Sequence, residues 1–203
     1  GTNELTLANA PFQARLLAVV GQPYGQIYGT DFTYDANGNK VVDADGAYIP
    51  SAQKSLGTVT PKYNMGLRNN FKYKNLNFGF LIDMQEGGSY FSTSHMWGSY
   101  SGMLEHTATP GLRENGVVVD AVYEDGTKNT SVLPGQAWAQ QHYGLDAMNV
   151  FDASYVKLRE VTFGYTLPKK IIGPLAEIRF SLFARNLFAW GLDWKGMDPE
   201  MAS

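Results

Sequence analysis

Apolar and polar residues alternate most regularly between Tyr63 and Met84. Alternation with a period of two is the pattern of a β-strand that has one apolar face. Only about two residues near Lys74 and Asn75 connect the two arms, so the pattern predicts a tight hairpin at residues 63–84. Each arm has about ten residues, enough to cross a bilayer as a tilted strand, although strands of a water-soluble sandwich show the same pattern.

A second hairpin is predicted at residues 154–189. Phe163, Tyr165 and Leu167 occupy alternate positions up to Pro168, which cannot donate to a sheet and therefore ends the strand. A partner strand follows, because Ile178 and the apolar residues at every second position after it share one face.

The connections between these strands are unequal in length. The first hairpin has a short turn, residues 85–152 form a long stretch rich in Gly, Ser, Thr, Asn and Tyr, and residues 168–176 form another short connection. A further outer loop is predicted to start at residues 190–203. Short turns on one side and long loops on the other are typical of outer-membrane barrels, whereas a structureless loop of about 65 residues is unusual in a compact soluble domain.

The N-terminal region is predicted to contain strands at residues 5–20 and 26–34, separated by a turn at residues 21–25. Two turn signals follow, Asn37-Gly38 and Asp45-Gly46. The spacing of acidic and amide residues invites a calcium interpretation. An EF-hand loop, however, needs glycine at its sixth position, whereas glycine falls fourth when counted from Asp35, so the pattern favours ordinary turns.

Composition argues against several classes of protein, nucleic-acid-binding proteins first among them. The chain has 203 residues, a formal net charge of -3 and 16 Lys plus Arg, so the basic footprint of a nucleic-acid-binding protein is missing. Aromatic residues make up 13% and glycine occurs 22 times, a balance common in β-rich proteins with many turns. There are no cysteines for disulfides or thiolate metal sites, no apolar run long enough for a membrane helix, and no signal-peptide pattern at Gly1.

Three segments near the C-terminus resemble a known family when taken in order. They are FDASYVKLREVTFGYTLPKK, RFSLFARNLFAW and KGMDPE, between Phe151 and Glu200. They closely resemble the "YvKLRevtlgYtlP" strand, "grNLf" strand and "GxDPE" loop of the C-terminal region of SusC/RagA-family TonB-dependent outer-membrane transporters. The VGQPYGQIYG segment, Tyr73-Lys74-Asn75 and the EGG turn at residues 86–88 add to the resemblance.

The resemblance implies an all-β fold of antiparallel up-and-down strands with long loops, as one segment of an outer-membrane β-barrel of about 22 strands. It also implies a function in the cell outer membrane. Such proteins import glycans or peptides with energy transmitted by TonB, and a SusD-like surface lipoprotein is their partner. No cofactor is implied. The family continues past its DPE loop to closing strands, which are missing before Ser203, so we expect a single incomplete β region over residues 1–203.

In this topology, residues 63–73 and 154–167 descend towards the periplasm while residues 75–84 and 177–189 ascend. Asn77 and Asp83 are then expected in the lumen, and Tyr73, Phe188 and Trp190, together with Tyr165, in aromatic girdles at the strand ends. The residues expected to face lipid are Leu76, Phe78, Phe80, Ile82, Met84, Phe163 and Tyr165.

The long loop, predicted to be extracellular, has a composition that suits contact with sugar faces or a partner protein, although its aromatic residues could equally pack the loop onto itself. The candidate contact residues are Tyr90, Trp97, Tyr100, Trp138, His142 and Tyr143. Its histidines, His95 and His106 besides His142, match no metal-ligand spacing and are expected to be exposed. No catalytic motif is recognisable, so we expect no enzyme.

A segment with two open edges exposes unpaired backbone groups. The chain is therefore expected either to work as a component of a complete transporter barrel or, as the alternative, to fold as a soluble, self-associating β-rich binding or adhesion module. As a fragment alone it is expected to be inactive in transport.

Overall fold

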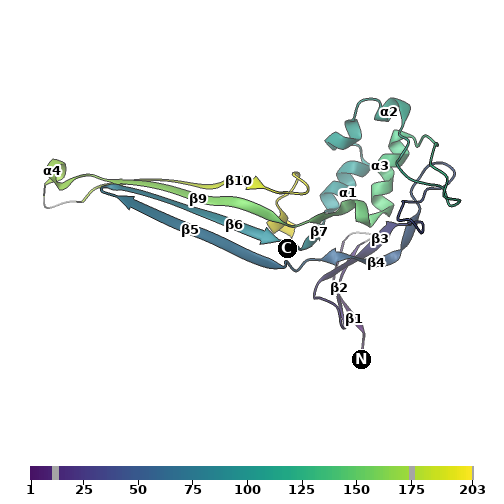
Figure 1. Ribbon diagram of the computed structural model, residues 1–203, viewed down its shortest axis with the longest axis horizontal. Helices are drawn as coiled ribbons and strands as arrows, with labels where there is room; N and C mark the ends of the chain where they lie inside the picture. The colour runs from purple at the N-terminus through teal and green to yellow at the C-terminus, as the bar shows by residue number, and fades with distance from the viewer. Residues whose placement is uncertain (11–13, 174–176, 203) are drawn as a thin grey trace. The chain divides into compact units, whose positions relative to one another are not determined.

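The structure is a computed structural model that describes residues 1–10, 14–173 and 177–202. It divides into two compact units (Figure 1). The first contains Gly1–Thr60, Ser89–Phe151 and the C-terminal segment from Gly196, and the second contains Pro61–Gly88 and Asp152–Lys195. The sequence predicted a single β region over residues 1–203.

The second unit is a four-stranded antiparallel sheet with strand order β10-β9-β6-β5. Its strands are β5 (Tyr63–Tyr73), β6 (Leu76–Glu86), β9 (Tyr155–Thr166) and β10 (Arg179–Trp190), with the short helix α4 (Lys169–Ile172) after β9. Both predicted hairpins are therefore present. Lys74 adopts a positive φ of 51° in the two-residue turn between β5 and β6. The predicted connection at residues 168–176 includes residues 174–176, which lie outside the described residues.

A β-bulge interrupts the register in the middle of β9 and β10. Leu81 of β6 pairs with Glu160, but Ile82 pairs with Leu158, so Arg159 is an extra residue on β9. On β10 the register shifts between Arg185 and Phe188, and Asn186 has a φ of 51°. Asparagine tolerates this left-handed conformation better than most residues do, which explains its place in the NLF segment.

The first unit contains a second antiparallel sheet with strand order β1-β2-β3-β4. Its strands are β1 (Glu4–Asn9), β2 (Arg15–Val19), β3 (Gln26–Phe32) and β4 (Pro50–Thr58), and a separate pair is formed by β7 (Ser89–Phe91) and β8 (Val150–Asp152). The strand predicted at residues 5–20 is thus divided into β1 and β2, and residues 11–13 between them lie outside the described residues.

The two turns after β3 are confirmed. The side-chain Oδ1 of Asp35 accepts hydrogen bonds from the backbone amides of Asn37 and Asn39, each at 2.8 Å. Asp43 makes the same arrangement, accepting from Asp45 at 3.0 Å and from Ala47 at 2.9 Å. Their carboxylates are engaged in Asx-turns, as the turn interpretation predicts.

The long segment after β6 contains helices where the sequence predicted an irregular loop. They are α1 (Thr93–Tyr100), α2 (Leu112–Asn115) and α3 (Gly135–Gly144), with the 3₁₀ turns η1 (Glu105–Ala108) and η2 (Asp146–Asn149), and a further 3₁₀ turn, η3 (Pro199–Ala202), lies near the C-terminus. Ser92 caps α1, because its hydroxyl accepts from the amide of His95 at 3.0 Å. Met96 and Ala139 are buried, and the helices gather together in Figure 1.

Antiparallel strands with long connections confirm the predicted fold class. The two larger sheets are open, and no closed barrel forms from the described residues. The strand number of a complete barrel stays a prediction. No helix in the described part of the chain is both long and apolar enough to cross a membrane.

Candidate functional site

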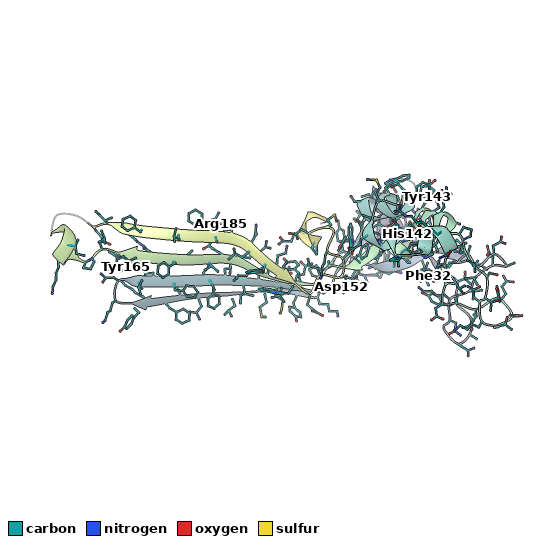
Figure 2. The ribbon with its side chains drawn as sticks, turned by 90° about the horizontal axis from the view of Figure 1, so that it is seen from above. Phe32, His142, Tyr143, Asp152, Tyr165 and Arg185 are labelled. Carbon is teal, nitrogen blue, oxygen red and sulfur yellow. The ribbon has the colours of Figure 1, made fainter. Side chains whose placement is uncertain are left out.

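The sheet of the second unit has one continuous apolar face. The register places Phe71, Phe78, Phe163 and Leu182 in one row across the four strands, from β5 to β10. The next row towards the hairpin turn contains Tyr73, Leu76, Tyr165 and Phe180, and further rows follow in the other direction. We call this surface the apolar face; Tyr165 is labelled on it in Figure 2.

Aromatic rings contact one another along the apolar face. The ring centroids of Phe71 and Phe78 are 6.3 Å apart, and those of Phe78 and Phe80 are 6.2 Å apart. At the other end of the sheet, Phe188 stacks on Trp190 at 5.8 Å. Packing across strands contributes to the stability of the sheet, yet it leaves the outer surface of these rings open.

All the residues predicted to face lipid lie on the apolar face. Leu76, Phe78 and Phe163 are exposed, whereas Phe80, Ile82, Met84 and Tyr165 are partly buried by their neighbours. Leu182 is 74% exposed. Water-soluble monomers rarely expose apolar patches of more than a few hundred square ångströms, so this face needs an apolar environment or a partner.

The opposite face of the same sheet, which we call the polar face, is built from the intervening residues. Asn77 and Asp83, predicted for a lumen, lie on it. The side chain of Arg159 donates from Nε and one terminal nitrogen to Oδ2 of Asp83, at 2.9 and 2.7 Å, and the hydroxyl of Tyr155 donates to the same oxygen at 3.3 Å. The carboxylate of Asp83 is therefore hydrogen-bonded within the sheet itself.

The bulge in β9 determines which charged residues reach the polar face. Regular alternation would place Arg159 and Glu160 on opposite faces. With the extra residue, Arg159 reaches Asp83 while Glu160 pairs across to Arg185 of β10 at 3.5 Å. A bulge therefore keeps both charges off the apolar face, which is a common role for such irregularities.

In the first unit, part of the predicted contact set forms an aromatic cluster between α1 and α3. The ring centroid of Trp97 lies 5.6 Å from that of Tyr100 and 5.6 Å from that of Tyr143, and the two tyrosine rings are 5.9 Å apart. Trp97 and Tyr100 are exposed, and Tyr143 is partly buried. These three residues, which we call the aromatic cluster, present a surface that a ligand or partner could contact.

The other predicted contact residues lie deeper. Tyr90 is 3% exposed and packs against Phe151, with 5.6 Å between ring centroids, and His142 is also 3% exposed. Trp138 is partly buried against His142 at 5.2 Å. Because Tyr90 and His142 present almost no surface, the contact surface does not extend to them.

The three histidines of the chain pack together instead of lying exposed and apart. The ring centroids of His95, His106 and His142 are 5.1 to 5.6 Å from one another. Nδ1 of His95 lies 3.0 Å from Oδ1 of Asn149, Nε2 of His106 lies 3.1 Å from Oγ of Ser99, and Nδ1 of His142 donates to the carbonyl oxygen of Ala139 at 3.0 Å. We call this group the histidine cluster (Figure 2 labels His142).

Burial favours the neutral form of these imidazoles. It lowers the pKa of His142 to about 4, with smaller contributions in the same direction from His95 and His106. Burial also lowers the pKa of His95 and of His106. Among the described residues, no group of three or more His, Asp or Glu side chains is placed to hold a metal ion. The histidine cluster is thus a packed, uncharged core at neutral pH.

One structurally important carboxyl group was not predicted. Asp146 is fully buried, and its Oδ2 accepts a hydrogen bond from the amide of Thr30 on β3 at 2.9 Å. The hydroxyl of Thr30 contacts the carbonyl oxygen of Gly144 at 2.8 Å and accepts from the amide of Asp146 at 3.0 Å. A Cβ on Gly29 would lie 2.6 Å from Asp146, so glycine is required there. Burial raises the pKa of Asp146.

Comparison with known proteins finds relatives in sequence and in structure. No family model matches the chain. It is 29% identical over 162 residues to TonB-dependent receptor P3 of Formosa agariphila, covering 78% of this chain and 15% of the receptor. It is 24% identical over 181 residues to TonB-dependent receptor P26 of the same organism, covering 86% of this chain and 16% of that protein.

Solved structures with the same fold include the RagAB peptide transporter, with a TM-score of 0.62 and 22% identity, and the RagAB peptide importer in its open-open state, with a TM-score of 0.61 and 21% identity. Each alignment covers 98% of this chain and 22% of the matched chain. The chain thus spans less than a quarter of the length of these proteins. The predicted resemblance is confirmed: the chain is similar in sequence to part of TonB-dependent receptors and shares the fold of part of the RagAB transporter.

Proposed function

We propose that the chain is a component of a TonB-dependent outer-membrane transporter that imports glycans or peptides. The second unit forms part of the barrel wall, with its apolar face against lipid and its polar face towards the lumen. TonB supplies the energy, and a SusD-like surface lipoprotein is the partner. Two kinds of relative support this proposal, since the sequence relatives are named TonB-dependent receptors and the matched structures belong to a peptide transporter.

The observation that carries the proposal is the division of one sheet into an apolar and a polar face. In a water-soluble sandwich, an apolar face of this kind is covered by a second sheet. Here Leu182 and Phe180 are 74% and 62% exposed. A lipid bilayer covers such a surface without any further protein layer.

Strand lengths support the same placement. β5 and β6 have 11 residues each, and β9 and β10 have 12 each. At about 3.3 Å per residue these strands are roughly 36–40 Å long, and a tilt of about 45° reduces their height to about 25–28 Å. The apolar band of an outer-membrane barrel is about 25 Å tall. β5 and β10 end the sheet, and in a complete barrel both would pair with further strands.

The aromatic cluster is proposed as a contact surface for cargo or for the lipoprotein, on a segment that faces the outside of the cell. Indole and phenol rings offer large rigid surfaces together with polar edges, which suits both sugar faces and protein partners. Trp138 lies on the same helix as Tyr143 but packs against His106 and His142.

Cysteine labelling tests the placement of the sheet, and this chain contributes no native cysteine to the background. Phe78→Cys and Leu182→Cys, placed in the complete protein in outer-membrane vesicles, are expected to resist a water-soluble maleimide. Asn77→Cys and Ser181→Cys, their neighbours on the polar face, are expected to react. Equal reaction of both pairs, with a protein that stays monomeric without detergent, would favour the soluble binding or adhesion module instead.

A further inference from the structure

The polar face of the sheet carries an excess of positive charge that the composition of the whole chain conceals. The chain has a net charge of -3. The register nevertheless places six basic side chains and two acidic ones on this face. They are Arg68 and Lys72 of β5, Lys157 and Arg159 of β9, and Arg179 and Arg185 of β10, against Asp83 and Glu160.

Each of the two carboxylates on this face is paired with one arginine. Asp83 is held by Arg159 at 2.7 Å, and Glu160 lies 3.5 Å from Arg185. Arg179 is exposed and makes no ion pair within the described residues. Arg159 at the bulge has Asp83 as its carboxylate partner, whereas Arg179 has no such partner among the described residues.

A cavity of about 300 Å³ lies on the polar face around Arg179. Its lining is mixed: apolar residues, among them the exposed Phe183, lie beside a polar set that consists of Asn77, Glu160, Thr162, Arg179, Ser181 and Arg185. These groups come from three adjacent strands, β6, β9 and β10, so the sheet holds their backbones in fixed register.

Glycine at position 164 allows the guanidinium of Arg179 to take its place in this cavity. A Cβ built on Gly164 would lie 3.0 Å from one terminal nitrogen of Arg179 and 3.2 Å from its Nε. The guanidinium thus lies over the backbone of β9. A Cβ at position 164 would require the guanidinium to shift by a few tenths of an ångström. On the opposite side of Gly164, Asn77 occupies the paired position on β6.

A guanidinium beside hydroxyl and amide groups suits an oxyanion ligand such as a carboxylate. The planar fork of arginine donates two parallel hydrogen bonds to a carboxylate, and Ser, Thr and Asn can donate to its remaining lone pairs. We propose that this cavity is a carboxylate-binding site centred on Arg179, and that its ligand is an acidic cargo molecule. The inference rests on the proposed function only in treating the polar face as the wall of the lumen.

Binding measurements on the complete protein in detergent test the site without requiring transport. Isothermal titration at low salt would use trigalacturonate and triglutamate as probes, and maltotriose as the neutral control. We expect the acidic probes alone to bind, and binding to weaken as salt rises. Binding of trigalacturonate alone would identify an acidic glycan as the cargo, and binding of triglutamate alone an acidic peptide.

Substitutions locate the site. Arg179→Gln is expected to weaken binding by about tenfold or more, since a hydrogen-bonded charge is removed. Arg179→Lys restores the charge without the fork and is expected to recover binding only in part. Arg68→Gln removes the same charge from the same face but lies outside the cavity, so it is the matched control and should leave affinity within about twofold.

Equal weakening by Arg179→Gln and Arg68→Gln would overturn a localised site. Absence of binding to the wild-type protein would overturn the cargo assignment; if Arg179→Gln then also lowered the Tm, an acidic side chain of the protein itself would be the occupant. A negative binding result would not alter the outcome of the cysteine labelling, and a negative labelling result would not alter the binding of the acidic probes. The two experiments therefore distinguish failure of the carboxylate-binding site from failure of the proposed function.

Discussion

Acidification should loosen the helical part of the first unit through the histidine cluster. His142 is buried and neutral in the fold, with a pKa of about 4, against an ordinary value of 6.5. The unfolded segment therefore binds a proton more readily than the folded one. Stability from this residue is fully present above the ordinary pKa and is lost as the pH falls from about 6.5 to about 4.

The magnitude follows from the gap between the two pKa values. The loss of folding stability grows by about 1.4 kcal/mol for each pH unit below the pKa of the unfolded histidine. It therefore reaches about 2 kcal/mol at pH 5 and levels off near 3 kcal/mol below pH 4. His95 and His106, whose pKa values are also lowered by burial, add to the loss. Asp146 opposes it, because a raised carboxyl pKa makes the fold take up a proton as the pH falls.

Hydrogen–deuterium exchange of the amides of α3 measures this effect, after correction for the intrinsic exchange rate at each pH. Between pH 7.4 and pH 5, the opening equilibrium of the wild-type helix should rise by about 30-fold from His142 alone. His142→Phe keeps an aromatic ring in the cluster but cannot titrate, so its helix should lose much less protection over the same interval. Equal losses of amide protection in the wild-type protein and in His142→Phe would refute the idea that protonation of His142 loosens the helix.

Two further predictions concern packing and the two faces of the sheet. Gly29→Ala places a Cβ 2.6 Å from Asp146 and should destabilise the first unit by about 1–3 kcal/mol in denaturant unfolding, whereas Gly144→Ala, where a Cβ meets nothing within 4 Å, should change stability by no more than about 0.5 kcal/mol. Leu182→Arg on the apolar face should cost about 2–4 kcal/mol of folding free energy in lipid, while Ser181→Arg on the polar face should cost less than about 1 kcal/mol; equal costs would contradict the division into two faces.

The strands of the second unit could be predicted from the sequence because each strand carries its own signal. The alternation around Phe78 needs no distant contact to be recognised, and the two-residue turn at Lys74 fixes the register of β5 and β6. The bulge was less visible, although consecutive charges at Arg159 and Glu160 between apolar residues break the alternation and could have indicated it.

The first unit could not be predicted in the same way, since its structure depends on contacts between distant residues. Helix α1 is short, and its polar sequence gives no clear 3.6-residue pattern, so only the Ser92 cap offered a local signal. The bond between Thr30 and Asp146 joins residues 116 positions apart. The gathering of three histidines likewise follows from helix packing and not from their spacing.

The apolar face also explains why the composition alone was a poor guide to function. Charged residues of both signs and apolar residues are mixed along the chain. Only the strand register shows that the apolar residues lie on one face of the sheet and the charged residues on the other. Exposed Phe180 and Leu182 then become evidence for a lipid environment, while the same register concentrates the basic residues on the other side.

Spin-label accessibility along β6 tests the central claim most directly. A nitroxide placed at each position of Leu76–Glu86 in turn, in the complete protein reconstituted into lipid, reports collision with oxygen in the membrane and with a water-soluble nickel chelate. We expect oxygen accessibility to peak at positions 76, 78, 80, 82 and 84, with nickel accessibility highest at the intervening positions. Profiles without a two-residue period, or with the two phases exchanged, would contradict the placement of this sheet in a barrel wall.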